Sequence, residues 1–147
     1  MTTPTRILVP VDFSPNSEHA LDYAVNLASR LDATVHVLNV IGIPTLGVPE
    51  LGVAVTSGVI DSIVRENQDA VDKLVAARKT KAKLADGILR TGDPRDTILQ
   101  VAAEIGADLI VMGTHGRRGL TRALVGSVAE AIVRTSPVPV LTLRQPK

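Results

Sequence analysis

Apolar residues form five short runs along the chain, and longer segments with helical spacing separate them. Short aliphatic runs are typical of buried strands, and apolar residues three and four positions apart are typical of helices. Two helix starts combine a capping side chain with a proline, at Ser14-Pro15 and Asp93-Pro94. The predicted strands are Arg6–Val11, Thr34–Ile41, Ile88–Leu89 with its flanks, Asp108–Met112 and Val138–Leu143; the predicted helices run from Ser14 to Leu31, from about Thr56 to about Lys83, from Asp93 to about Glu104, and from about Ser127 to Arg134.

Strand and helix alternate from one end of this pattern to the other. Parallel strands need a crossover between them, and the crossovers are right-handed. The alternation therefore predicts an α/β fold, an open, doubly wound (Rossmann-like) parallel sheet with helices on both faces. A length of 147 residues suits a single domain over residues 1–147, and an apolar content of 45% is enough for its core.

Composition excludes several classes of protein. The 16 basic and 15 acidic residues give a net charge of +1, which argues against a nucleic-acid-binding protein. The chain has no cysteine, and its three histidines lack ligand spacing, so neither disulfides nor a structural metal site is expected. The segment Ala33–Ile60 is nearly uncharged, but prolines and glycines interrupt it, so no membrane span is expected. We expect a cytoplasmic protein.

The last predicted strand, Val138–Leu143, contains an unusual pair of prolines. Pro137 and Pro139 are two residues apart, so both missing N–H groups lie on the same side of the strand. One interpretation is an edge strand blunted against aggregation. The other is that one side pairs within the sheet and the remaining side is available to a partner chain.

Two predicted strand ends carry candidate chemistry. In an open sheet of this kind, ligands bind beyond the carboxyl ends of the strands, where the strand order reverses. The first strand leads into Pro10–Ser14, and the fourth leads into Gly113–Ser127, which holds four of the eleven glycines. Glycines allow main-chain N–H groups to approach an anion, and a helix N-terminus attracts phosphate. Positive charge is added by His115, Arg117, Arg118 and Arg122.

Simpler explanations exist for each of these residues. Ser127 and Glu130 have the spacing of a capping box, so Ser127 could only begin a helix. Gly113 could simply end a strand, and the arginines could form a solvated face. Asp12 could accept a hydrogen bond from a ribose or a base, or it could cap its own loop. The residues alone leave these alternatives open.

The glycine spacing resembles that of a known family. Gly113-x2-Gly116-x9-Gly126-Ser127 matches the nucleotide signature G-x2-G-x9-G-[ST] of universal stress proteins. The opening ILVPVDFSPNS, the segment ADLIVMGTHGRRGL and the ending SVAEAIVRTSPVPVLTLR are also similar to that family. The resemblance covers about Arg6 to Arg144 and is to UspA-like domains of the subgroup that binds ATP.

This resemblance implies a five-stranded sheet in the order 3-2-1-4-5 and an ATP site, with or without Mg²⁺, between strands one and four. By position, phosphates and ribose would be held by the glycine signature, adenosine by the end of the first strand, and adenine by backbone groups of Val40. The segment Gly42–Val55 could fold over the base. The site residues implied are Pro10, Val11, Asp12, Val40, Gly113, His115, Gly116, Arg117, Gly126, Ser127 and Val128.

The resemblance also implies a homodimer through Val138–Leu143, which favours the partner interpretation of that strand. The expected function is regulatory: a stress-response protein whose bound ATP alters contacts with a protein partner. The alternative is an enzyme with slow or partner-dependent ATP hydrolysis or phosphoryl transfer. No Walker lysine and no clear pair of metal-binding carboxylates is visible in the sequence, so no catalytic residue is assigned.

Overall fold

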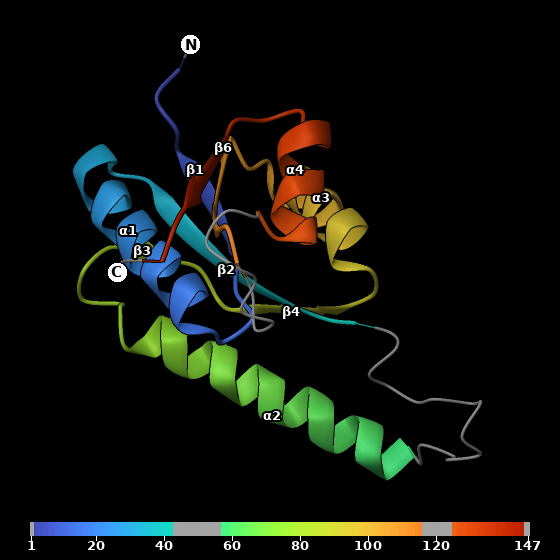
Figure 1. The fold of residues 1–147 in the computed structure, drawn as a ribbon. Coiled ribbons are helices and arrows are strands. Elements are labelled where there is room, and N and C mark those ends of the chain that lie inside the picture. Colours follow the sequence, from blue (N-terminus) through green and yellow to red (C-terminus); the bar gives the residue numbers. More distant parts are fainter. Residues whose placement is uncertain (1, 43–56, 116–124, 146–147) are drawn as a thin grey trace.

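A computed structural model describes residues 2–42, 57–115 and 125–145 of the chain. The fold is a parallel β-sheet between two layers of helices, as Figure 1 shows. Its elements are β1 (Arg6–Pro10), α1 (Pro15–Leu31), β2 (Thr34–Ile41), α2 (Ser57–Ala76), β3 (Lys83–Leu84), β4 (Ile88–Thr91), α3 (Pro94–Ile105), β5 (Leu109–Gly113), α4 (Ser127–Thr135) and β6 (Val140–Leu143).

The strand order is β3-β2-β1-β5-β6, with β4 also paired to β2, and every pairing is parallel. The predicted order is confirmed, but the predicted third strand is divided into two pieces. β3 pairs with the start of β2, and β4 pairs with its end. Gly87 lies between them, where an added Cβ would collide with a methyl of Val71 in α2. This close approach of the helix accompanies the interruption of the strand.

Two predicted boundaries are wrong. The second helix was expected to reach about Lys83, but α2 ends at Ala76, and the basic residues that follow form turns leading to β3. The last buried residues of α2 are Val71 and Val75, so no apolar face continues beyond them. The last strand begins at Val140 rather than Val138, because the Ser136 hydroxyl bonds both the N–H and the C=O of Val138.

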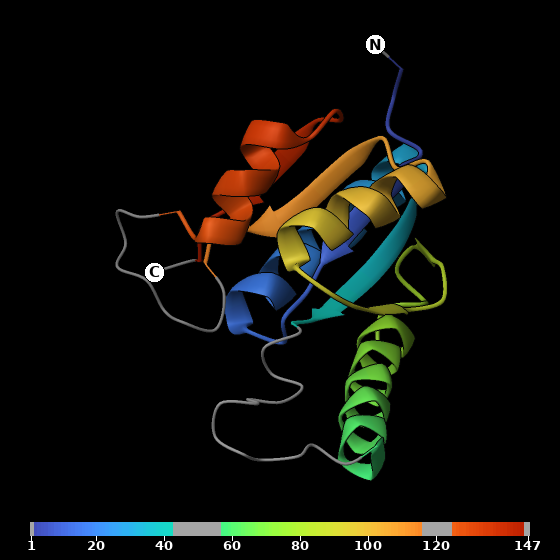
Figure 2. The same cartoon turned by 90° about the vertical axis from the view of Figure 1, so that its right-hand side faces the viewer.

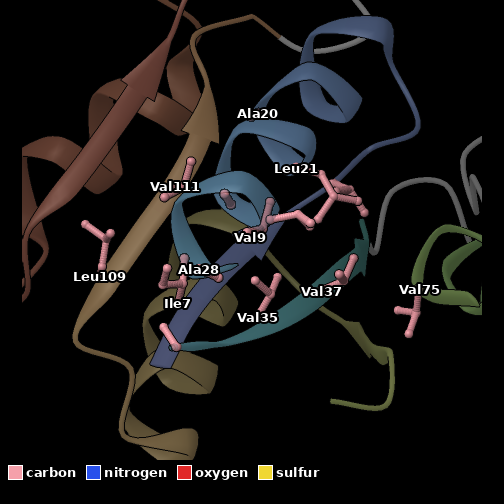
Figure 3. Close-up of a cluster of buried hydrophobic side chains, with 14 of the residues drawn as sticks. Ile7, Val9, Ala20, Leu21, Ala28, Val35, Val37, Val75, Leu109 and Val111 are labelled. Atoms are coloured by element: carbon pink, nitrogen blue, oxygen red, sulfur yellow. The ribbon is translucent and has the colours of Figure 1, made fainter. Parts of the chain in front are cut away.

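Both faces of the sheet are buried. Along β1, Ile7 and Val9 face a cluster with α1 and α2, whereas Leu8 faces a cluster with α3 and α4. Figure 3 shows the first cluster between α1 and the sheet, and Figure 2 shows α3 and α4 on the other side. Such two-sided burial explains why these strands are continuous apolar runs. Of the described helices, none combines the length and the hydropathy that a membrane span requires.

Asp108 joins the starts of β1 and β5. Its carboxylate accepts hydrogen bonds from the N–H of Thr5 at 2.9 and 3.0 Å, from the Thr5 hydroxyl at 2.9 Å, and from the N–H of Arg6 at 2.9 Å. Burial alone would raise the pKa of Asp108, but these hydrogen bonds outweigh it and hold the pKa below its usual value. The ionised carboxylate therefore stabilises the fold.

We expect Asp108→Asn to lower the free energy of unfolding at pH 7 by about 1 kcal/mol, because the ionised acceptor is lost. Since the folded state depresses the pKa, this contribution is complete above the unfolded pKa of about 3.9 and is lost as the pH falls through the folded pKa. The difference between wild type and variant should thus shrink below about pH 4. Urea unfolding at pH 7 and at successively lower pH measures it, with Asp61→Asn, on the exposed face of α2, as control. A difference that does not change with pH would contradict this role.

Candidate functional site

The order of the sheet reverses between β1 and β5, which are neighbours although α1, α2 and α3 separate them in sequence. At their carboxyl ends the chain continues into Val11–Ser14 after β1 and into Thr114-His115 after β5 (Figure 1). A crevice at such a reversal is the usual ligand site of a doubly wound sheet. The predicted site residues that follow β1 and β5 therefore lie at the same edge of the sheet, its carboxyl edge.

The segment after β1 makes a sharp, closely bonded turn. The N–H of Val11 extends the sheet to the carbonyl of Leu38 at 2.7 Å, and Phe13 has the left-handed φ of 65°. Such a conformation costs a residue other than glycine about 1–2 kcal/mol. Asp12 accepts a hydrogen bond from the N–H of Ser14 at 3.0 Å, and its own N–H bonds the Ser17 hydroxyl at 3.3 Å. Asp12 thus caps its own loop, as one of its two interpretations held.

This turn starts α1 as predicted. The Ser14 hydroxyl accepts from the N–H of Ser17 at 3.2 Å, and Pro15 occupies the first helical position. The predicted N-cap is confirmed. The turn brings Asn16, in the first turn of α1, against the end of β5.

The segment after β5 is held on three sides. The N–H of Thr114 bonds the carbonyl of Leu143 at 2.9 Å, and its carbonyl accepts from the N–H of Gly126 at 2.6 Å. The carbonyl of His115 accepts from the Asn16 side chain at 2.9 Å. The Thr114 hydroxyl lies 3.0 Å from Nδ1 of His115. The hydrogen bond from the Gly126 N–H to the Thr114 carbonyl brings the start of α4 beside the end of β5.

Gly113 and Gly126 both lie where a side chain would collide with protein atoms. A Cβ on Gly113 would be 2.5 Å from Nδ2 of Asn16, and a Cβ on Gly126 would be 2.9 Å from the carbonyl oxygen of Thr114. The sequence suggested that glycine makes room for a ligand. Among the described residues, glycine is required first of all for the close packing of α1 and α4 against the end of β5.

The N-terminus of α4 corrects the capping-box interpretation. Gly126 is the N-cap, no side chain of the described residues caps the helix, and Ser127 is already in its first turn. The carboxylate of Glu130 does not reach back, because it pairs with Arg134 one turn later at 3.1 Å. The N–H groups of this first turn are therefore not used by a capping side chain from the described part of the chain, and they carry the positive end of the helix dipole.

The other predicted residues divide into two groups. Pro10 ends β1, Val11 is buried, and Val40 lies near the end of β2, packed against the cluster of α3 and α4. Gly116 and Arg117 lie outside the described residues, as do Arg118, Arg122 and most of the segment Gly42–Val55. In the described ranges, no group of three His, Cys, Asp or Glu side chains could hold a metal ion.

Sequence reasoning missed two residues at this edge, Asn16 and Asn39. Asn39 donates from Nδ2 to the carbonyl of Val11 at 2.8 Å. The only available signal was a single amide inside the apolar run TVHVLNVI. Within the described part of the chain, three buried side-chain polar atoms have no hydrogen-bond partner: Oδ1 of Asn16, Oδ1 of Asn39 and Nε2 of His115. All three belong to the residues at or around the ends of β1 and β5.

Known proteins share this architecture over nearly the full length. The universal stress protein MJ0531 of Methanocaldococcus jannaschii is 36% identical over 145 residues, which are 97% of this chain and 83% of the relative. The structure of the protein MJ0577 superimposes with a TM-score of 0.85 at 26% identity and covers 99% of both chains. A universal stress protein in complex with cAMP has a TM-score of 0.64 at 25% identity and covers 97% of this chain and 98% of its own.

The family model gives the same result. Residues 4–144 match the model of the universal stress protein family. That range includes both strand ends and all of the described elements. The chain therefore belongs to the universal stress protein family.

Proposed function

We propose that this protein is a single-domain, cytoplasmic stress-response protein that binds ATP between the ends of β1 and β5 and acts through a protein partner. The observation that carries the proposal is the N-terminus of α4. Within residues 2–42, 57–115 and 125–145 no side chain caps it, and the hydrogen bond from Gly126 to Thr114 fixes it beside the end of β5. An uncapped helix N-terminus at the reversal of a doubly wound sheet suits a phosphate group.

The residues present fit a nucleotide at this edge. The N–H groups of Ser127 and Val128 would donate to phosphate oxygens. Gly113 and Gly126 would lie beside the phosphates, as would Gly116 and Arg117, which are outside the described residues. Pro10, Val11 and Asp12 would contact adenosine, Val40 would contact adenine, and His115 would lie beside the phosphates. A relative binds cAMP, which supports a nucleotide. The glycine spacing favours ATP, and Mg²⁺ would be held mainly by its phosphates.

This arrangement suits binding better than turnover. Helix N–H groups and glycines stabilise the charge of bound phosphates, but hydrolysis also needs a group that positions water. Asp12 is the carboxylate in the turn after β1, and its Oδ1 already accepts a hydrogen bond from the N–H of Ser14. ATP would then act as a regulatory ligand whose presence changes the surface offered to a partner.

We expect the wild-type protein to bind ATP with micromolar affinity and Gly126→Ala to weaken that binding at least tenfold. The added Cβ would collide with the Thr114 carbonyl and displace the start of α4 from the end of β5. Isothermal titration calorimetry with ATP measures both affinities.

A matched control is Gly106→Ala at the other edge of the sheet. Gly106 caps α3 with a left-handed φ of 66°, so alanine there should cost about 1 kcal/mol of stability and leave ATP binding unchanged. If Gly126→Ala binds ATP as tightly as the wild type, the start of α4 does not hold phosphate. If the wild type binds no ATP, the proposed function is wrong.

We also expect the purified protein to hydrolyse ATP far more slowly than the roughly 1–100 s⁻¹ of kinases. Phosphate release from radiolabelled ATP, measured with and without Mg²⁺, gives the rate. A rate inside that range would favour the enzyme alternative over regulatory binding.

β6 supports the proposal of a homodimer. The carbonyls of Pro139 and Leu143 accept from the N–H groups of Ile110 and Thr114 at 3.0 and 2.9 Å, so alternate residues of β6 face β5. The backbone groups of Val140 and Thr142 consequently point to the outer side, where no described strand lies. Pro139, whose carbonyl faces β5, belongs to the inner set, and Pro137 lies before β6, so neither removes an N–H from the outer side of β6. This outer edge can pair antiparallel with a second copy.

Thr142→Pro should convert the proposed dimer into a monomer, because it removes the outer N–H and keeps the inner hydrogen bonds. Thr142→Val, which retains the N–H, is the matched control and should stay dimeric. Light scattering coupled to size exclusion gives the masses, and far-UV circular dichroism reports whether both variants fold. A folded Thr142→Pro variant that remains dimeric would place the interface elsewhere.

A further inference from the structure

Two asparagine side chains are buried at the carboxyl end of the sheet. Asn16, in the first turn of α1, is 2% exposed, and Asn39, in β2, is 5% exposed. Residues two positions apart in a strand share a face, and the neighbours of Asn39 on its face, Val37 and Ile41, are buried and aliphatic. Burial of an amide costs free energy unless its polar atoms are all paired.

Each amide uses its donor in the same way. Nδ2 of Asn16 donates to the carbonyl of His115, 99 residues away, and Nδ2 of Asn39 donates to the carbonyl of Val11, 28 residues away. Both acceptors lie just past the last paired residues of their strands. The pairing of β1 with β2 ends at Pro10, and that of β5 with β6 ends at Gly113.

Neither amide is fully paired within the described residues, since Oδ1 of each is buried without a partner. A leucine has the same branching at Cγ and would avoid this unpaired oxygen. One hydrogen bond to a carbonyl is a small net gain, and an unpaired buried acceptor is a comparable or larger loss. Each donor does serve the fold, because the carbonyl of Val11 or His115 would otherwise lose this partner. The loss of that bond and the removal of the unpaired oxygen roughly offset one another, so stability alone gives only a weak reason for an asparagine at either position.

The orientation of the two carbonyls gives a better reason. Val11 belongs to the segment proposed to contact adenosine, and His115 belongs to the segment proposed to lie beside the phosphates. A peptide group is planar, so a hydrogen bond to its carbonyl fixes the orientation of the whole group. Since both side chains are buried, they act on the site through these main-chain segments rather than by touching a ligand.

We infer that Asn16 and Asn39 are positioning residues of the nucleotide site, Asn39 for the adenosine side and Asn16 for the phosphate side. This inference rests on the proposed function. It predicts that loss of either amide impairs binding without impairing folding, and that the two losses differ in which part of the nucleotide they affect.

Calorimetric titration of ATP and adenosine into the wild type, Asn16→Leu and Asn39→Leu tests the inference. Asn39→Leu should weaken ATP and adenosine by the same factor, about tenfold, the factor that one hydrogen bond is worth at most. Asn16→Leu should weaken ATP by a similar factor and leave adenosine within about twofold of the wild type. The melting temperatures should stay close to that of the wild type, because each substitution removes one hydrogen bond to a carbonyl and one unpaired buried oxygen.

Asn26→Leu is the matched control, because Asn26 is exposed on α1 and the substitution is the same. It should change neither affinity. If a leucine does not fit and a variant fails to fold, Asn16→Ala and Asn39→Ala remove the same donors with less volume. If adenosine alone binds too weakly to measure, the ATP affinities of the two variants decide.

Unchanged ATP affinity in both folded variants would overturn the inference. So would a loss of affinity that only follows a fall in melting temperature, because that is the result of a purely structural role. The wild-type titration answers a separate question. If the wild type binds neither ATP nor adenosine, the proposed function itself has failed.

Discussion

The sheet can pair its main-chain groups only as far as its strands run side by side, and the groups beyond the last rung need other partners. Buried N–H and C=O groups in proteins are almost always bonded. At the carboxyl edge, the carbonyls of Val11, Thr114 and His115 are bonded by Asn39, Gly126 and Asn16. These three bonds tie β2, α4 and α1 to the ends of β1 and β5. The geometry of the candidate site follows from how this edge is closed.

Closure at such short range determines which residues fit. The start of α4 approaches Thr114 so closely that its N-cap can only be glycine, and a glycine has no side chain to cap the helix. Close packing also requires glycine at the end of β5, where Gly113 leaves room for the side chain of Asn16. The close packing of α4 against the end of β5 and the open N-terminus of this helix thus both follow from the glycine at position 126. A phosphate-binding geometry is compatible with glycines that also have a purely structural reason.

The periodicity of the sequence was sufficient for the order of the elements because the central strands β1, β2 and β5 are buried along most of their length and the helices bury one face. It failed where tertiary contacts decide. Helix spacing alone could not show that α2 loses its core contacts after Val75, or that Ser136 would occupy the backbone of Val138. Glu130 has the spacing of a capping box but pairs with Arg134. Asn16 and Asn39 could not be predicted as site residues, since their partners lie 99 and 28 residues away.

The two edges of the sheet differ in how completely their polar groups are paired. At the amino edge, the Asp108 carboxylate accepts hydrogen bonds from the N–H and the hydroxyl of Thr5 and from the N–H of Arg6. Each edge has one left-handed residue that is not glycine, Phe13 at the carboxyl edge and Asp32 before β2 at the amino edge. Only at the carboxyl edge do described side chains, those of Asn16, Asn39 and His115, bury a polar atom without a described partner. Each such atom costs about 1–3 kcal/mol. Strain and unpaired groups persist where the surrounding structure enforces them and often mark functional sites. The concentration of the unpaired side-chain atoms at one edge therefore favours the view that this edge is arranged for a ligand and not for stability.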